Sequence, residues 1–430
     1  MKYDRISKDL YIRNRQKFTA HMENGALAVF NSNDIYPISA DSTMPFQQHR
    51  DILYLSGVDQ EESILVLFPD SKDKEHREVL FLRETSEHIA VWEGEKLTKE
   101  AAFETSGIRK VYWLNQFDSV FRKLMAEATA VYLNKNEHLR ASLEVETRED
   151  RFIKKIKQDY PAHEVRKSAP ILHRIRSVKE KEELDLMQRA CNITEAGFRR
   201  VLQFIKPGVW EYEIEAELAH EFLRNRSRGF AYTPIVASGK NACVLHYIEN
   251  NKQCNNGDVI LLDVGAEYAN YASDLTRCVP VSGRFTPRQK EVYASVLHVK
   301  KEAEKLLVPG TMLAEYHTEV GKLMEEQLLK LKLIDKTDIA NQRPEWPAYK
   351  KYFMHGTSHF LGLDTHDVGL WHAPIEAGMV FTCEPGIYIP EEGLGIRLED
   401  DLVVQEKGAP FNLMSSIPIE AEEIEDLMNS

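Results

Sequence analysis

The segment HGTSHFLGLDTHDVG, from His355 to Gly369, contains three histidines, two aspartates and three glycines. Imidazole and carboxylate groups bind divalent metals and transfer protons near neutral pH. His355 and His359 have the spacing of the helical zinc motif HExxH, but Gly356 replaces its glutamate and Gly362 disfavours a helix. We therefore expect a loop or strand here, in which only some of the three histidines bind metal.

Two aspartates lie in a second segment, ILLDVGAEYANYASDLTR. Asp263 and Asp274 stand on strand-like runs around a turn near Ala269-Asn270. In a regular hairpin with a two-residue turn, Asp263 is paired with Thr276, and Asp274 is a diagonal neighbour on the same face, about 7–8 Å away between backbones. The two carboxylates then converge, unless a bulge turns one of them away. The alternative is that one aspartate caps the turn and the other is solvated.

The segment FTCEPGIYIPEEGLGIRLEDDLVV repeats this pattern. Glu384 and Glu399 lie on two strand-like runs around a turn at 390–393. On the second run, Glu399 and Asp401 share one face and Asp400 points to the other. Asp400 and Asp401 fit a solvated edge. Glu399 instead lies among apolar residues, where a lone carboxylate is costly without a cation.

Four carboxylates and at least one histidine are thus the candidate ligands of one site. Their charge of about −4 would be strongly repulsive in a cleft, and two divalent cations would neutralise it. Oxygen-rich ligation without thiolate favours a hard or borderline ion, Mn²⁺ before Zn²⁺. Two such ions would bind a hydroxide and polarise a carbonyl, so hydrolysis is the expected reaction class.

The elements that carry these residues belong to a chain long enough for two domains, at 430 residues. Residues 1–168 mix strand-like runs with helical stretches, as in an α/β domain with a mixed sheet. The runs are ALAVF, ESILVLF, EVLFL and AVYL, and the clearest helix is SVFRKLMAEA.

Residues 169–430 read as α+β, with short β-rich runs around the candidate ligands. A long helix is predicted after a capping box formed by Ser177 and Glu180. Further helices are predicted over Glu211–Arg224 and over Arg288–Leu307, the latter capped by Thr286.

Charge and composition exclude several classes of protein. The net charge of −13 opposes binding to nucleic acid or to an anionic membrane. The N-terminus has no unbroken apolar run, and no stretch of eighteen apolar residues occurs, so we expect a cytoplasmic protein that does not enter a membrane. The five cysteines include no CxxC pair, which favours reduced thiols.

The chain resembles the proline-specific branch of the pita-bread metallopeptidases, the aminopeptidase P group. Five motifs carry the resemblance in the family's order: VLHYIENN, LLDVGAEYANYASDLTR, HGTSHFLGLDTHDVG, CEPGIYI and GIRLEDD. The segments PFQQHRDILYLSGV, VWEG and EEIEDLM extend it over nearly the whole chain. The resemblance implies an N-terminal creatinase-like α/β domain and a C-terminal pita-bread α+β catalytic domain.

The resemblance also implies a ligand set for two metal ions, usually Mn²⁺ in this family. Asp274 and Glu399 would bridge the ions, Asp263 would complete the shell of one, and His359 with Glu384 would serve the other. Glu384 would also carry the proton from the attacking hydroxide to the leaving imino nitrogen, as a general acid and base.

Further positions match substrate and transition-state residues of the family. His246, His355 and His366 would orient the peptide around the proline and stabilise the oxyanion as neutral donors. Arg397 would act through the acids near the metals, and Tyr388 would line the active site. Trp92 matches a tryptophan that closes a neighbouring subunit's site in the family's oligomers, although a core tryptophan is the alternative.

Two segments depart from the family pattern. His49 and Arg50 stand where the family often has an aspartate and a small residue, which concerns the contact of the first domain with the substrate amine. The segment 336–353 matches only in outline, and we expect it to shape the groove beyond the proline.

The function implied is a metalloaminopeptidase that releases the N-terminal residue from peptides with proline in second position, as a homodimer or homotetramer. Prolidase is the nearest alternative, with the same fold and metals but restricted to Xaa-Pro dipeptides. A methionine aminopeptidase commonly lacks so long a first domain. A metal-free pita-bread binding protein, or a metal-free creatinase-like hydrolase, would not need all five ligands.

Overall fold

The computed structural model describes residues 3–430 and divides into two compact units, one of residues 4–176 and one that contains residues 177–430 together with Tyr3. Along the chain, the first unit ends at Arg176 and the second begins at Ser177. The division at residue 168 inferred from sequence stays a prediction. Among the residues described, no helix has the length and apolar composition needed to cross a bilayer.

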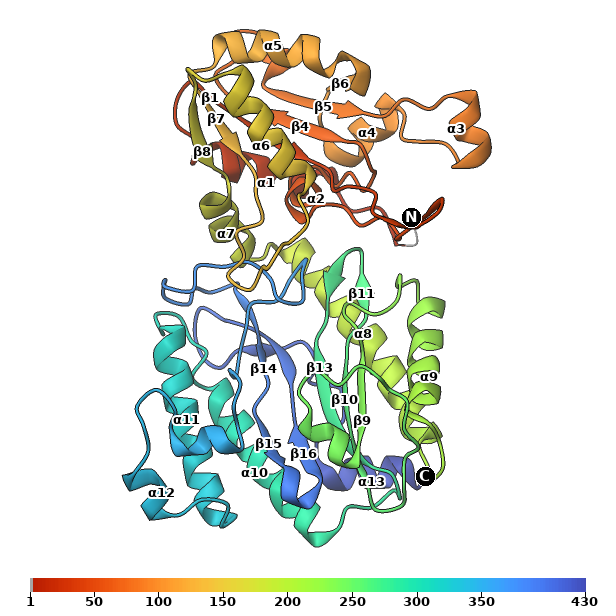
Figure 1. The fold of residues 1–430 in the computed structure, drawn as a ribbon, viewed down its shortest axis with the longest axis vertical. Coiled ribbons are helices and arrows are strands. Elements are labelled where there is room, and N and C mark those ends of the chain that lie inside the picture. Colours follow the sequence, from red (N-terminus) through yellow and green to blue (C-terminus); the bar gives the residue numbers. More distant parts are fainter. Residues whose placement is uncertain (1–2) are drawn as a thin grey trace. The chain divides into compact units, whose positions relative to one another are not determined.

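The N-terminal unit is built on a mixed six-stranded sheet in the order β6-β5-β4-β1-β7-β8 (Figure 1). β1 runs antiparallel to β4 and parallel to β7. Helices α5 and α6 bring an apolar face onto the sheet and close its core. The strands of the sheet are β1 (Ala26–Asn31), β4 (Ile64–Leu67), β5 (Glu78–Leu82), β6 (Lys110–Trp113), β7 (Ala130–Leu133) and β8 (Glu164–Lys167). A short hairpin, β2 (Pro37–Ser39) and β3 (Ser42–Thr43), lies outside it.

Each apolar run expected as a strand in this unit is a strand, which confirms the α/β prediction. The helices are α1 (Lys8–Thr19), α2 (Arg50–Ser56), α3 (Glu87–Trp92), α4 (Lys99–Ser106), α5 (Phe117–Glu127), α6 (Arg148–Asp159) and α7 (Ala169–Ser177). His49 caps α2 by accepting the amide N–H of Asp51.

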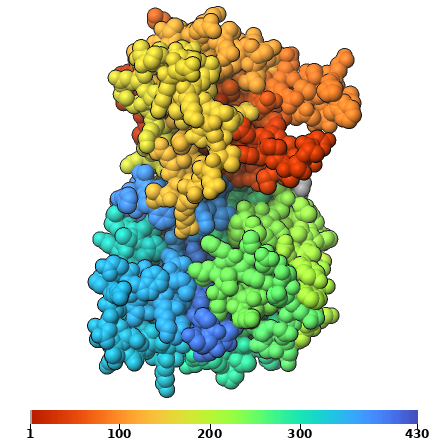
Figure 2. Space-filling model, viewed as in Figure 1, coloured from red at the N-terminus to blue at the C-terminus, as the bar shows by residue number. Residues whose placement is uncertain are grey.

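The C-terminal unit places short sheets between two groups of helices. In Figure 1, β14 to β16 lie between α10–α12 on one side and β9, β10 and β13 with α8 and α9 on the other. The space-filling view (Figure 2) shows the same division of this unit's surface, with green and light-blue segments on either side of darker blue. The strands are β9 (Ile235–Ser238), β10 (Val259–Val264), β11 (Glu267–Tyr268), β12 (Tyr271–Ala272), β13 (Leu275–Pro280), β14 (Val380–Cys383), β15 (Gly386–Ile389), β16 (Leu394–Arg397), β17 (Asp400–Val403) and β18 (Phe411–Asn412).

The helices of this unit are α8 (Lys181–Phe204), α9 (Glu211–Arg224), α10 (Pro287–Glu304), α11 (Leu313–Lys330), α12 (Lys336–Ala340) and α13 (Ala421–Met428). α9 has the predicted bounds, and α10 starts at the predicted cap, Thr286, with Pro287 in its first turn. The predicted capping box of α8 is wrong, because Glu180 caps this helix and exchanges hydrogen bonds with Glu183. All five cysteines are free thiols.

Candidate metal centre and active site

The hairpin of β10 and β13 brings the first two acidic ligands together. Asp263 is paired with Thr276, as the alternation of the sequence predicted, and the register is the same at the tip of the hairpin, where Tyr268 faces Tyr271. Both residues of the turn, Ala269 and Asn270, have positive φ, which is typical of a type I′ turn. No bulge intervenes in the paired residues, so the carboxylates of Asp263 and Asp274 point to the same side of the hairpin.

The hydroxyl of Tyr232 contacts the carboxylates of both Asp263 and Asp274. Its oxygen is 2.7 Å from Oδ1 of Asp263 and 2.6 Å from Oδ1 of Asp274. Because one tyrosine hydroxyl touches both carboxylates, the alternative of a turn cap and a separate solvated aspartate is wrong. Tyr232 was not among the predicted residues, since it belongs to no motif and precedes β9 in a stretch without strand character.

The second hairpin supplies the two glutamates. β14 pairs with β17 and β15 with β16 in one common register, which places Glu384 opposite Glu399 at the break between the strand segments. A single bridge between Thr276 and Glu399 joins this hairpin to the first, and Thr276 Oγ1 donates a 2.6 Å hydrogen bond to Glu399 Oε2. The two hairpins therefore present their acids to one shared space.

His359 faces this space from a non-helical segment, as expected. Its ring is buried, with Nε2 at 3.5 Å from Asp274 Oδ2 and 3.7 Å from Glu384 Oε1. Nδ1 lies 3.0 Å from the carbonyl oxygen of Phe360, which assigns the proton to Nδ1 and leaves Nε2 directed at the acids. This tautomer is the one that a metal-binding histidine needs.

Asp274, His359 and Glu399 form a buried group whose ligand atoms lie within 4.8 Å of one another. Burial, followed by repulsion from Asp274 and Glu384, raises the pKa of Glu399 well above its usual range. Burial also raises the pKa of Glu384 to about 7. The acids are thus close, desolvated and mutually repulsive.

One protein cation enters the cluster. Arg397 is buried and donates to Asp263 Oδ2, to the Tyr388 hydroxyl at 2.8 Å and to Thr276 Oγ1 at 3.2 Å. The Tyr388 oxygen in turn lies 2.7 Å from His355 Nε2. Since Arg397 can only donate, the Tyr388 proton is available for His355, and these three side chains form one chain of hydrogen bonds.

His355 lies at the edge of the centre, with Nδ1 at 3.7 Å from Glu384 Oε2. Burial, with the charge of Arg397, lowers its pKa to about 3, so the imidazole is neutral at neutral pH. His366 packs edge-on against His359, with ring centroids 4.4 Å apart. His246 is exposed.

Trp92 belongs to the N-terminal unit, at the end of α3, with 76% of its surface exposed. A core tryptophan, the alternative kept open from the sequence, is therefore wrong. Its role at a neighbouring subunit's site stays a prediction.

Asp400 and Asp401 are buried, at 2% and 0% exposure, so the expectation of a solvated edge is wrong for both. Asp400 accepts hydrogen bonds from Arg277 at 2.6 Å and from Lys300 at 2.5 Å. Asp401 Oδ2 accepts the backbone N–H of Asp274 at 3.1 Å. These partners come from remote segments, which a local strand pattern does not reveal.

The donor set fits divalent cations. Four carboxylates and one imidazole nitrogen surround the shared space, and Arg397 compensates only one of their negative charges. The buried thiols near these strands have other partners: Cys191 contacts Asp401, and Cys278 and Cys383 contact backbone carbonyl oxygens. Such oxygen-rich sets bind Mg²⁺, Mn²⁺ or, with imidazole, Zn²⁺.

Comparison with known proteins agrees with this geometry. Residues 185–406 match the model of metallopeptidase family M24, and residues 11–132 match the N-terminal domain of aminopeptidase P. The chain belongs to metallopeptidase family M24. It is 36% identical to the Xaa-Pro aminopeptidase of Escherichia coli, over 98% of each chain.

Solved structures of other M24 peptidases have the same fold. An E. coli aminopeptidase P variant in complex with substrate superposes with a TM-score of 0.88 at 33% identity, over 99% of each chain. The Zn-substituted E. coli enzyme in complex with product gives 0.88 at 34% identity, also over 99% of each chain. The predicted two-domain architecture, with an aminopeptidase P N-terminal domain and a pita-bread catalytic domain, is thereby confirmed.

Proposed function

We propose that this M24 peptidase is a metalloaminopeptidase that hydrolyses the Xaa-Pro bond of peptides with proline in second position. The observation that carries the proposal is the buried group of acids around His359, at the position of the metal ligands expected for the family. The substrate class is supported by the similarity to the Xaa-Pro aminopeptidase of E. coli, which extends over 98% of each chain.

Two divalent ions, Mn²⁺ in the first place, are the proposed cofactors. Asp263, Asp274, His359, Glu384 and Glu399 would hold them, because their charge exceeds what Arg397 compensates and their donors are oxygen-rich. When bound, such ions polarise a carbonyl and lower the pKa of a coordinated water.

The side chains around this centre have separable tasks. Glu384 lies between His355 and His359, where its carboxylate can accept a proton and return it to the leaving nitrogen. Neutral His355, whose Nε2 accepts from Tyr388 and whose Nδ1 donates to the carbonyl oxygen of Gly356, can line the peptide site without adding charge. His246 and His366 are the further proposed substrate contacts.

Proline specificity follows from what proline lacks. A proline in second position has no amide N–H, so a site that provides no acceptor at that point leaves nothing unpaired with proline and disfavours other residues. Prolidase activity is the second candidate, because its site would share the same fold and metals.

Turnover of matched peptides separates the two candidates. The protein with added Mn²⁺ is incubated with an Xaa-Pro dipeptide, an Xaa-Pro-Pro tripeptide and a longer Xaa-Pro peptide that share one first residue. Release of the first residue from the longer peptides supports the aminopeptidase, whereas cleavage of the dipeptide alone would identify a prolidase. Absence of turnover with fewer than two bound metal ions would indicate a binding protein.

Cytoplasmic location and assembly into a dimer or tetramer stay predictions. Sedimentation of the metal-loaded protein would measure its oligomeric state.

A further inference from the structure

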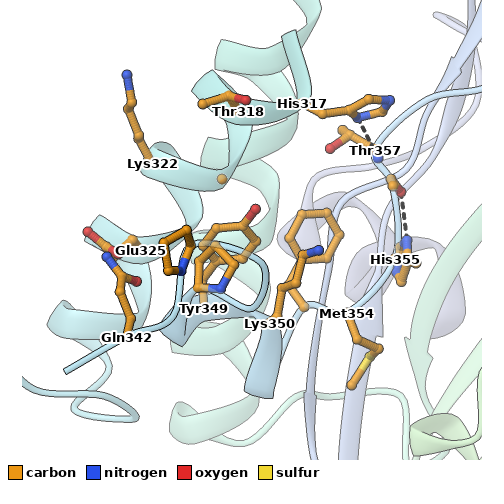
Figure 3. A pocket seen from close by; sticks show the side chains of 15 residues that line it. His317, Thr318, Lys322, Glu325, Gln342, Tyr349, Lys350, Met354, His355 and Thr357 are labelled. Atoms are coloured by element: carbon orange, nitrogen blue, oxygen red, sulfur yellow. Dashed lines mark hydrogen bonds between the residues drawn. The ribbon is translucent and has the colours of Figure 1, made fainter. Parts of the chain in front are cut away.

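A pocket of about 690 Å³ opens beside His355 in the C-terminal unit (Figure 3). One wall is a face of α11 that includes His317, Thr318 and Lys322. Residues 354–357 form another wall, and the segment before them contributes Tyr349 and Lys350. We refer to this cavity as the α11 pocket. Its size is that of a ligand-binding site and exceeds what one side chain fills.

The α11 pocket shares its wall with the proposed active site. The amide N–H of Thr357 donates to His317 Nδ1 at 3.3 Å on the pocket side. The carbonyl oxygen of the same residue accepts the amide N–H of Glu384 at 2.8 Å. His355 lines the pocket and has its Nδ1 3.7 Å from Glu384 Oε2, so the pocket adjoins the metal centre at His355.

The walls combine an aromatic surface with a hydrogen-bond donor. The ring of Tyr349 lies against α11 at Gly321, where a Cβ atom would come within 2.7 Å of it, and its centroid is 6.3 Å from that of Phe353. Because Nδ1 of His317 accepts the Thr357 N–H, its proton resides on Nε2, which can donate to a peptide carbonyl. Burial lowers the pKa of His317 to about 4, in keeping with a neutral ring.

The charges of the pocket favour an anion. Its lining carries two lysines and one glutamate, in a chain whose net charge is −13. Lys322 is paired with Glu319 at 2.7 Å. Lys350 contacts the ring of Trp346 at 5.3 Å and forms no ion pair with any acid of residues 3–430. Lys350 is thus the cation of the pocket that a ligand carboxylate can approach.

We propose that the α11 pocket binds the part of a peptide that follows the proline, with a carboxylate of that part placed at Lys350. The carboxylate comes either from the peptide C-terminus or from an acidic side chain. The proposal rests on the proposed function and narrows its substrates to peptides that extend beyond the proline and carry a negative charge there.

The test uses Xaa-Pro peptides of three to six residues in three forms: free acid, C-terminal amide, and amide with one glutamate after the proline. Turnover is measured with Mn²⁺, and binding is measured by calorimetry with the same peptides. At one length or more, we expect amidation to raise KM and the dissociation constant about threefold to fivefold, as for a partly exposed ion pair. Restoration by the glutamate would show that a side-chain carboxylate can take the place of the C-terminus, and its absence that the site accepts the C-terminal carboxylate alone.

Two neighbouring lysines provide the matched variants. Lys350→Ala should remove the difference between acid and amide, whereas Lys351→Ala should retain it, because Lys351 lies in the same 3-10 turn but does not line the α11 pocket. Thr318→Trp should fill the pocket and therefore weaken the binding of long peptides more than that of the shortest one. Glu326→Trp, on an exposed part of α11, should leave the binding of long and short peptides unchanged.

The outcomes separate the two proposals. If long peptides bind and are cleaved but Lys350→Ala and Lys351→Ala respond equally to amidation, the pocket assignment is wrong and the peptidase function stands. If no Xaa-Pro peptide is cleaved while binding depends on Lys350, the function is wrong and the pocket assignment stands.

Discussion

Glu399 and Asp400 are adjacent in the sequence and both buried, yet they belong to opposite electrostatic environments. Asp400 accepts from Arg277 and Lys300, and these cations hold its pKa below the usual range even though burial opposes them. Burial and neighbouring acids instead raise the pKa of Glu399. The alternation of the strand separates the two environments by one residue.

The comparison indicates how to recognise a metal site among buried acids. Around Asp400 the chain supplies its own cations, so this cluster is complete and structural. Around Glu399, residues 3–430 supply three further acids and a single cation, Arg397, and the remaining charge must be met by protons or by metal ions. A buried carboxylate without enough protein cations is therefore the more informative one.

The largest expected effect comes from Glu399→Ala. Removal of this predicted bridging ligand should lower kcat/KM on an Xaa-Pro-Pro peptide more than about 1,000-fold and reduce the bound metal. In the metal-free protein, the free energy of unfolding should be unchanged or higher, because a repelled buried acid is lost. Kinetics, elemental analysis and urea unfolding measure the three quantities; wild-type turnover with full metal content would contradict the assignment.

Asp400→Ala should act on stability instead. It leaves Arg277 and Lys300 buried without their partner, which should cost about 3–5 kcal/mol of unfolding free energy, with or without metal. Glu406→Ala, at an exposed position after β17, is the control and should change it by less than about 0.5 kcal/mol. Urea unfolding followed by circular dichroism makes the comparison. Equal stability of the two variants would show that Asp400 is not a structural acid.

Metal removal should distinguish the clusters in the same way. With metal at a hundred times its dissociation constant, chelation should lower the unfolding free energy by about 2.7 kcal/mol. Calorimetric scans with and without a chelator should show this loss in the wild type and in a folded Asp400→Asn variant, but hardly in Glu399→Ala. A chelator effect of full size in Glu399→Ala would place the bound metal elsewhere.

The metal-free protein should lose stability as pH rises from about 4.5 to about 7. Over this window folded Glu384 keeps a proton that the unfolded chain releases, since burial raises its pKa to about 7, so the loss should be about 3 kcal/mol. Glu384→Gln should make the profile less steep, and the part caused by Glu399, whose pKa burial and neighbouring acids also raise, should remain. The pKa of Asp400 is lowered, so its stabilisation should instead disappear on acidification below about pH 4. Urea midpoints measured across this pH range test the predictions for Glu384 and for Asp400. A stability that rises between pH 4.5 and 7 would contradict the prediction for Glu384.

The smallest effect is expected from Thr276→Val. Its hydroxyl donates to Glu399 and accepts from Arg397, so its loss should weaken metal binding about tenfold without removing a ligand. Metal titration of the metal-free variant measures this, with Thr276→Ser as the rescue. If valine and serine bind metal equally well, the hydroxyl does not orient Glu399.

The sequence predicted those parts of the site that depend on strand alternation. The pairing of Asp263 with Thr276 follows from the two-residue turn, because an unbroken register fixes which side chains share a face. The helix bounds that carry local signals, such as Thr286 with Pro287, were also predictable.

What depends on remote partners was not predictable. Asp400 resembles a solvated acid until Arg277 and Lys300 are placed beside it, and Tyr232 joins the site only through the packing of its segment against both aspartates. The α11 pocket likewise arises where three separate segments meet. A single sequence shows periodicity, but not which distant side chain supplies a charge.

The unbroken register of the first hairpin also limits how this gene can change in length. Deletion of one residue between Asn270 and Asp274 would turn Asp274 to the opposite face or force the apolar residues after it out of the core. Loss of two residues would preserve the facing side. Viable insertions and deletions in these strands should therefore come in pairs of codons, and a relative with an odd-length change here should be suspected of having lost its metal.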